Sequence, residues 1–83
     1  MVQVAVIVKI YPEEADQVEA LSSKIKEQFN PKQMIFEDIG FGVKIIKATI
    51  YTDEDEGSSI LEDKLAQVEG VSNIEIVSVD RLN

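Results

Sequence analysis

The sequence predicts an α+β fold in which two helices cover one face of a four-stranded antiparallel sheet. Apolar side chains alternate with period two in residues 2–11 and 43–51, which is typical of strands with one face on a core. They recur at helical spacing in residues 13–29 and again in residues 59–68. With one further strand candidate after each helix, the order is β-α-β-β-α-β, the ferredoxin-like arrangement.

The first strand is expected at the centre of the sheet, because one of its faces is entirely apolar and the other is mixed. The apolar face carries Val2, Val4, Val6, Val8 and Ile10. Pro12 ends the strand, and Pro12-Glu13-Glu14 favours a helix start, since proline suits the first turn and carboxylates suit the positive end of the helix dipole. The helix is expected to end at Asn30-Pro31. Its core-facing stripe comprises Ala15, Val18, Leu21, Ile25 and Phe29.

The next segment predicts a hairpin between an edge strand and a central strand. Residues 32–38 end in Glu37 and Asp38, and such charges protect an edge strand from further pairing. The chain then turns sharply at residues 39–42, because glycine adopts backbone conformations that other residues avoid. In the strand that follows, Ile46, Ala48 and Ile50 are expected to face the helices, and Val43, Ile45 and Tyr51 the other side of the sheet.

The second half of the chain predicts a helix and a closing strand. Ser59 and Glu62 have the spacing of a capping box at the head of the helix, and Gly70 is placed as its C-terminal stop. The apolar stripe of this helix is Leu61, Leu65 and Val68. In residues 72–82 the apolar phase changes after Ile76, which indicates a bulge or the end of core contact at that point.

Composition limits the classes of function. The 83 residues are expected to form one domain, residues 1–83. A formal charge of −8 disfavours direct nucleic-acid binding. The chain has no cysteine and no histidine, which removes thiol chemistry and zinc sites built on these residues. No apolar run approaches the roughly 18 residues of a membrane span, and no secretory signal pattern opens the chain, so a cytoplasmic protein is expected.

An enzyme is also disfavoured. No nucleophile and base can be paired without histidine or cysteine, and Gly40-Phe41-Gly42 is a poor phosphate cradle because it leads into a strand. The acidic run 53–56 offers oxygen ligands for a divalent cation but lacks the alternating spacing of a calcium loop, which favours a solvated loop. We therefore expect no catalytic residue, no metal site, no cofactor and no stably bound small molecule.

Phe41 and Arg81 are the candidate contact residues. Taken alone, Phe41 is more readily explained as an aromatic that covers a core or a turn. Arg81 lies on the last strand after the apolar phase has changed. It is either an ordinary surface cation or a mobile positive group, on an otherwise acidic chain, that is directed at a partner.

Residues 39–44 carry the most specific motif of the chain, Ile39-Gly40-Phe41-Gly42-Val43-Lys44. It matches the I-G-F-G-I-K type stretch of the archaeal elongation factor 1-beta family, which the chain resembles over nearly its whole length. Residues 53–62 match an acidic loop followed by a small residue and Leu-Glu, and residues 71–76 match a V-x-S-x-D-V type ending. The chain departs from the family at Asp38, where proline is usual, and at Arg81, where eukaryotic members have lysine.

This resemblance implies a guanine nucleotide exchange factor that acts on the translational GTPase elongation factor 1-alpha. It implies that Phe41, in the turn made by Ile39, Gly40 and Gly42, docks into an apolar pocket of the GTPase. It also implies that Arg81 disturbs the magnesium and phosphate region, and that Phe41 and Arg81 lie on one accessible side of the fold. The alternative is a small-ligand regulatory module of the same fold that acts as a dimer, suggested by the apolar residues on the other face of the sheet.

Overall fold

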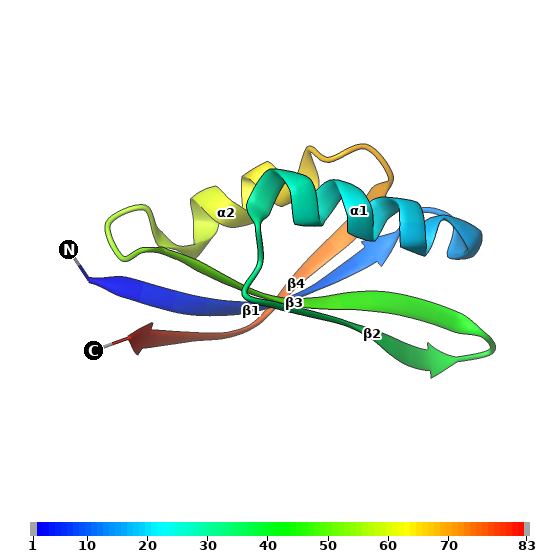
Figure 1. The fold of residues 1–83 in the computed structure, drawn as a ribbon, viewed down its shortest axis with the longest axis horizontal. Coiled ribbons are helices and arrows are strands. Elements are labelled where there is room, and N and C mark those ends of the chain that lie inside the picture. The colour runs from blue at the N-terminus through cyan, green and yellow to red at the C-terminus, as the bar shows by residue number, and fades with distance from the viewer. Residues whose placement is uncertain (1, 83) are drawn as a thin grey trace.

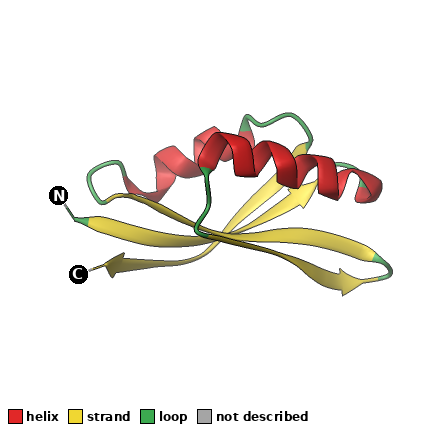
Figure 2. Ribbon diagram, in the orientation of Figure 1, coloured by secondary structure: helices red, strands yellow, loops and turns green. Residues whose placement is uncertain are grey.

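The computed structural model describes residues 2–82, which form one four-stranded antiparallel sheet with two α-helices on one of its faces (Figures 1 and 2). The strand order is β2-β3-β1-β4, so β1 and β3 are central and β2 and β4 are edges. The elements are β1 (Gln3–Pro12), a short 3₁₀ helix η1 (Ala15–Gln17), α1 (Val18–Phe29), β2 (Gln33–Gly40), β3 (Val43–Asp53), α2 (Gly57–Ala66) and β4 (Val71–Leu82). The predicted ferredoxin-like βαββαβ arrangement is confirmed.

The core lies between the sheet and the helices. Its strand residues are those predicted from the period-two pattern: Val4, Val6, Val8 and Ile10 on β1, and Ile46, Ala48 and Ile50 on β3. The helical side contributes Val18, Leu21, Ile25, Leu61, Leu65 and Val68. Residues paired directly across the β1–β3 ladder, such as Val8 and Ala48, point to the same face, so one register buries both apolar rows. Val2 continues the pattern in sequence but is exposed, because it precedes β1.

The prediction that the first helix starts at Pro12-Glu13-Glu14 is wrong. Pro12 is the last residue of β1 and pairs with Val71 on β4. The N–H of Glu13 then donates to the carbonyl of Gly70 over 2.8 Å, and Glu14 is still extended at φ −130° and ψ 134°. Pairing with the chain before β4 therefore overrides the local helix signals. Ala15 falls in η1 and is exposed, so it does not belong to the core-facing stripe of α1.

The predicted capping box of the second helix is also wrong. Ser59 lies inside α2, which begins at Gly57. Gly57 has φ of +74°, and this left-handed conformation redirects the chain from the preceding turn into the helix without a side-chain cap. Gly70 does not stop α2 directly, since the helix ends at Ala66. Val68 is buried in the segment between them.

Both strands of the hairpin extend further than predicted: β2 continues to Gly40 instead of ending at Asp38, and β3 to Asp53 instead of Tyr51, so the turn is confined to Phe41 and Gly42. The predicted end of the first helix is confirmed. α1 ends at Phe29, and Asn30 follows in the left-handed conformation with its N–H bonded to the carbonyl of Lys26. In the β1–β4 ladder Ile7 pairs with Ser78 whereas Val8 pairs with Ile76. Val77 is therefore the extra residue of a bulge, and the predicted change of phase near Ile76 is confirmed. Within residues 2–82, no helix is both long enough and apolar enough to cross a membrane.

Candidate functional site

The turn between β2 and β3 consists of Phe41 and Gly42. Gly40 pairs with Val43 across it, and φ is +58° at Phe41 and +74° at Gly42. Two consecutive positive φ angles are the requirement of a type I′ hairpin turn. Glycine meets it freely, whereas a residue with a Cβ is disfavoured there by about 1–2 kcal/mol. Phe41 is also fully exposed, at 105 % of its reference surface, so the folded chain gains no packing from this ring.

The backbone leading into this turn is fixed by Asp38. Asp38 pairs with Lys44 and Gly40 with Val43, which leaves Ile39 as the extra residue of a bulge. A carboxylate oxygen of Asp38 accepts a hydrogen bond from the N–H of Gly40 over 2.8 Å. This contact two residues along the chain is one that aspartate makes in turns. Asp38 therefore restrains the hairpin through its side chain.

Further apolar side chains lie on the same edge strand. Ile35, Phe36 and Ile39 are each about half exposed. Of the predicted site residues, Ile39, Gly40, Phe41 and Gly42 thus lie together at the hairpin, beside an apolar edge. The sequence analysis placed Phe36 only as an apolar residue of the edge strand, and the structure leaves it about half exposed. A Cβ built on Gly40 or on Gly42 meets nothing within 4 Å, so these positions require glycine for its conformation and not for space.

Arg81 lies at the other end of the sheet and is held by Glu54. Its Nε donates to one carboxylate oxygen of Glu54 over 2.7 Å and its Nη2 to the other over 2.8 Å. These hydrogen bonds and the opposite charge lower the pKa of Glu54 and raise the pKa of Arg81. The arginine, which the sequence left either as an ordinary surface cation or as a mobile group, is thus paired in this structure while its side chain stays 58 % exposed. Sequence reasoning missed Glu54 because its partner is 27 residues away.

Phe41 and Arg81 are both accessible, as expected, but they do not lie together. Val4 pairs with Arg81 on β4 and with Thr52 on β3. Thr52 is nine residues from Val43 along β3, which corresponds to about 30 Å of strand. In Figure 1 the β2–β3 hairpin and the chain termini accordingly lie at opposite ends of a molecule 40 Å long. Phe41 and Arg81 therefore do not form one patch, contrary to the expectation that they share one side of the fold. A partner that contacts both residues must extend over about 30 Å.

The sheet face away from the helices is less open than expected. Ile45 is completely buried there, and its direct neighbour Glu37 on β2 reaches across to the ammonium of Lys9, with Nζ 3.4 Å from Oε1. The hydroxyl of Tyr11 donates to Glu75 over 3.0 Å. The Glu37 contact raises the pKa of Lys9, and the Glu75 contact raises the pKa of Tyr11. These polar links cross part of the face on which the alternative of a small-ligand module depends, although a hollow of about 260 Å³ lined by Ile7, Ile35 and Thr49 among others remains there.

Two other apolar residues of this face, Tyr51 and Val43, are also partly covered by neighbouring groups. The ammonium of Lys32 lies 5.4 Å from the centre of the Tyr51 ring, a cation–π geometry, and Val43 is half-buried. Within the described residues, no three acidic side chains gather in an arrangement suited to a metal ion.

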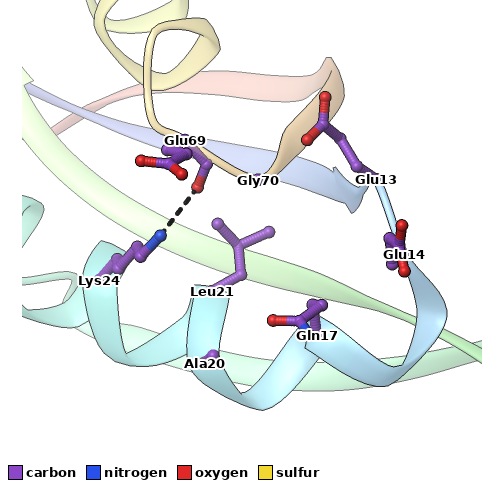
Figure 3. A pocket seen from close by; sticks show the side chains of 8 residues that line it. All are labelled: Glu13, Glu14, Gln17, Ala20, Leu21, Lys24, Glu69 and Gly70. Carbon is purple, nitrogen blue, oxygen red and sulfur yellow. Dashed lines mark hydrogen bonds between the residues drawn. The ribbon is translucent and has the colours of Figure 1, made fainter.

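A hollow of about 330 Å³ lies between the start of α1 and the turn before β4 (Figure 3). Its lining is mainly polar: Glu13, Glu14, Gln17, Ala20, Leu21, Lys24, Glu69 and Gly70. The ammonium of Lys24 spans it to reach the carbonyl of Glu69 over 3.3 Å. Small-molecule sites are mostly apolar with a few placed polar groups. This hollow has the opposite balance, and neither Phe41 nor Arg81 lines it.

Comparison with known proteins identifies the family. Residues 5–82 match the family described as the EF-1 guanine nucleotide exchange domain. The chain is 38% identical over 85 residues to an elongation factor 1-beta from Methanocorpusculum labreanum, and the alignment covers 99% of both chains. It is 33% identical over 89 residues to that of Aeropyrum pernix, again over 99% of both, and 32% identical over 90 residues to that of Desulfurococcus amylolyticus, over 100% of both. The chain therefore belongs to the EF-1 guanine nucleotide exchange domain family.

Proposed function

We propose that this chain promotes the release of GDP from the translational GTPase elongation factor 1-alpha, so that GTP can be reloaded during translation elongation. One observation carries the proposal beyond family membership. Phe41 combines a disfavoured backbone conformation with complete exposure, and neither contributes to the stability of the chain alone. An aromatic side chain held in this way is suited to enter an apolar pocket of a partner.

An exchange factor acts by differential binding and needs no catalytic group of its own. It accelerates release if it binds the nucleotide-free GTPase more tightly than the GDP-bound form. In this proposal Phe41 is the anchor, and its turn is formed by Ile39, Gly40 and Gly42. Arg81 acts separately, on the region that holds magnesium and phosphate. Its guanidinium carries a fixed positive charge and hydrogen-bond donors in a plane, which suits it to compete for anionic groups.

The distance between the two residues shapes the proposal. Because Phe41 and Arg81 are about 30 Å apart along the sheet, they contact two separate areas of the GTPase. The anchor provides affinity, and the arginine provides displacement of the nucleotide. The proposal takes residues 1–83 as one exchange domain that binds protein and not nucleic acid, without a cofactor, in the cytoplasm where elongation takes place.

The test is the release of a fluorescent GDP from elongation factor 1-alpha. The protein at micromolar concentration is expected to accelerate release, and no acceleration would remove the proposed function. Phe41→Ala is expected to lose binding. Arg81→Ala is expected to lose exchange rate while it keeps more of the binding.

Val77→Ala is the matched control. Val77 is an exposed apolar residue at the β4 bulge, away from both ends of the sheet. This variant is expected to bind and exchange as the unchanged protein does. Near-unchanged activity in both Phe41→Ala and Arg81→Ala would remove the site assignment and leave the function standing.

A further inference from the structure

We propose that Glu54 is a positioning residue for Arg81 in nucleotide exchange, an inference that rests on the function proposed above. A guanidinium group has two edges that can each hold an anion through two N–H groups. Glu54 occupies the edge made by Nε and Nη2, at 2.7 and 2.8 Å. The edge made by Nη1 and Nη2 is then the one presented to an anionic group of the partner.

Glu54 is itself bonded at the start of β1, the strand that pairs with β4, which carries Arg81. The N–H of Glu54 donates to the carbonyl of Val2 over 2.9 Å, just before β1 begins. Val4 on β1 pairs directly with Arg81. The turn is closed further on by the N–H of Glu56, which donates to the carbonyl of Asp53 over 3.1 Å. The backbones of Glu54 and Arg81 are therefore both attached to β1 or to the residue just before it, which holds the two side chains within reach of each other.

The surrounding charge explains why such a restraint is needed. Arg81 is the one basic residue in segments 52–57 and 78–82, which also contain the acidic residues Asp53, Glu54, Asp55, Glu56 and Asp80. Gln3 pairs with Asp53 on one side and with Leu82 on the other, so these segments lie at the same end of the sheet. An unrestrained arginine could pair with any of several carboxylates. The two-point contact with Glu54 selects one orientation.

The test replaces Glu54 with glutamine. The amide has one acceptor oxygen in place of two and no charge, so the two-point contact cannot form. We expect Glu54→Gln to lower the saturating rate of GDP release by about fivefold, within the range that coupled contact pairs span. The concentration of factor at half-saturation should change little. If Glu54 were only structural, Glu54→Gln would lower the amount of folded protein, while the saturating rate per folded molecule and the half-saturating concentration would both stay unchanged.

Two further variants isolate the contact. Asp55→Asn removes the same charge from the same turn, at a residue with no hydrogen bond to Arg81 within the described chain, and should exchange at the unchanged rate. Arg81→Lys keeps the positive charge but cannot make the two-point contact, so its rate should fall as well. In an Arg81→Ala background, Glu54→Gln should have no additional effect, because there is no guanidinium left to position.

The outcomes separate the two proposals. If the unchanged protein does not accelerate GDP release, the proposed function fails and this inference fails with it. If the unchanged protein is active and Glu54→Gln matches it, Glu54 does not position Arg81 and the function stands. A faster Glu54→Gln variant would mean that the carboxylate restrains Arg81 and would overturn the inference. If Glu54→Gln lowered the rate of GDP release by the same factor in the Arg81→Ala background, Glu54 would have a role separate from Arg81 and the inference would be overturned. If Glu54→Gln does not fold, seen by melting, the test passes to Glu54→Asp, which keeps the charge on a side chain one methylene shorter: a lowered saturating rate would support the inference, and an unchanged rate would overturn it.

Discussion

Replacing Phe41 with asparagine is expected to make the protein more stable and worse at nucleotide exchange. Phe41 is the first residue of the two-residue turn and has φ of +58°. Asparagine adopts this conformation more readily than phenylalanine, and Asn-Gly is the pair that type I′ turns favour most. Because the Phe41 side chain is fully exposed, the substitution removes no buried apolar surface. The change in stability should therefore reflect the backbone alone.

The size of the effect follows from this geometry. A non-glycine residue in the left-handed region is disfavoured by about 1–2 kcal/mol, and asparagine recovers part of that. We expect the free energy of unfolding to rise by about 1 kcal/mol. For a domain of this size, 1 kcal/mol corresponds to a rise of about 4–8 °C in melting temperature. This shift is large enough to measure by thermal melting, with urea unfolding as an independent check.

The same variant should lose acceleration of GDP release, because the aromatic anchor is gone. Phe41→Ala is the matched control: alanine also lacks the ring but retains the strain, so exchange should fall without a gain in stability. A less stable Phe41→Asn variant would mean that the ring packs against the protein, contrary to its exposure. A more stable variant with full exchange activity would refute the anchoring role.

Three further predictions concern stability. Ile45→Ala should lower the free energy of unfolding by about 2–5 kcal/mol in urea titrations, although Ile45 lies on the face away from the helices, because it is completely buried. Gly40→Ala should lower the free energy of unfolding by about 1–3 kcal/mol in the same assay. The reason is that φ is +104° at this position, and an added methyl group would gain no packing contact to offset the backbone strain. The pKa of Glu54 is lowered by Arg81, so the pair should stabilise the fold above the ordinary glutamate pKa of about 4.3, and this contribution should disappear as the pH falls through the lowered value. Urea unfolding of the unchanged protein and of Glu54→Gln should then differ at neutral pH and converge in acid; a difference that persists in acid would contradict the assignment.

The sheet could be predicted from the sequence because its signal is local and repeated. Each apolar row of β1 and β3 extends over several residues, and a shift by one residue would expose the whole row. The change of phase after Ile76 located the β4 bulge for the same reason. A pattern that spans many residues tolerates an ambiguous position within it.

The helix starts could not be predicted, because contacts distant in sequence decide them. Pro12-Glu13-Glu14 carries good local signals for a helix, yet the bond from Glu13 to Gly70 keeps the backbone extended. Ser59 and Glu62 have the spacing of a cap, but Gly57 had already turned the chain into α2. In both cases a single local motif was outweighed by the path of the neighbouring chain.

The candidate site divides in the same way. The exposed turn at Phe41 follows from Gly40 and Gly42, which are adjacent in sequence. The partner of Arg81 depends on the register of β1 with β3 and β4, which brings the turn after β3 next to the end of β4. No spacing in the sequence marks Glu54 among four consecutive acidic residues. Only the paired strands distinguish it from its neighbours.

The separation of Phe41 from Arg81 gives the sheet a part in the proposed mechanism. β3 runs from the hairpin to the Glu54 turn, and its pairing with β1 over eight residue pairs makes the connection stiff. Two contacts held about 30 Å apart on a stiff element bind best to the state of a partner whose two receiving areas have that spacing. A partner that changes this spacing when it loses its nucleotide would be bound more tightly in the empty state. Under the proposed function, exchange thus depends on the length and rigidity of β3 as well as on the two side chains at its ends.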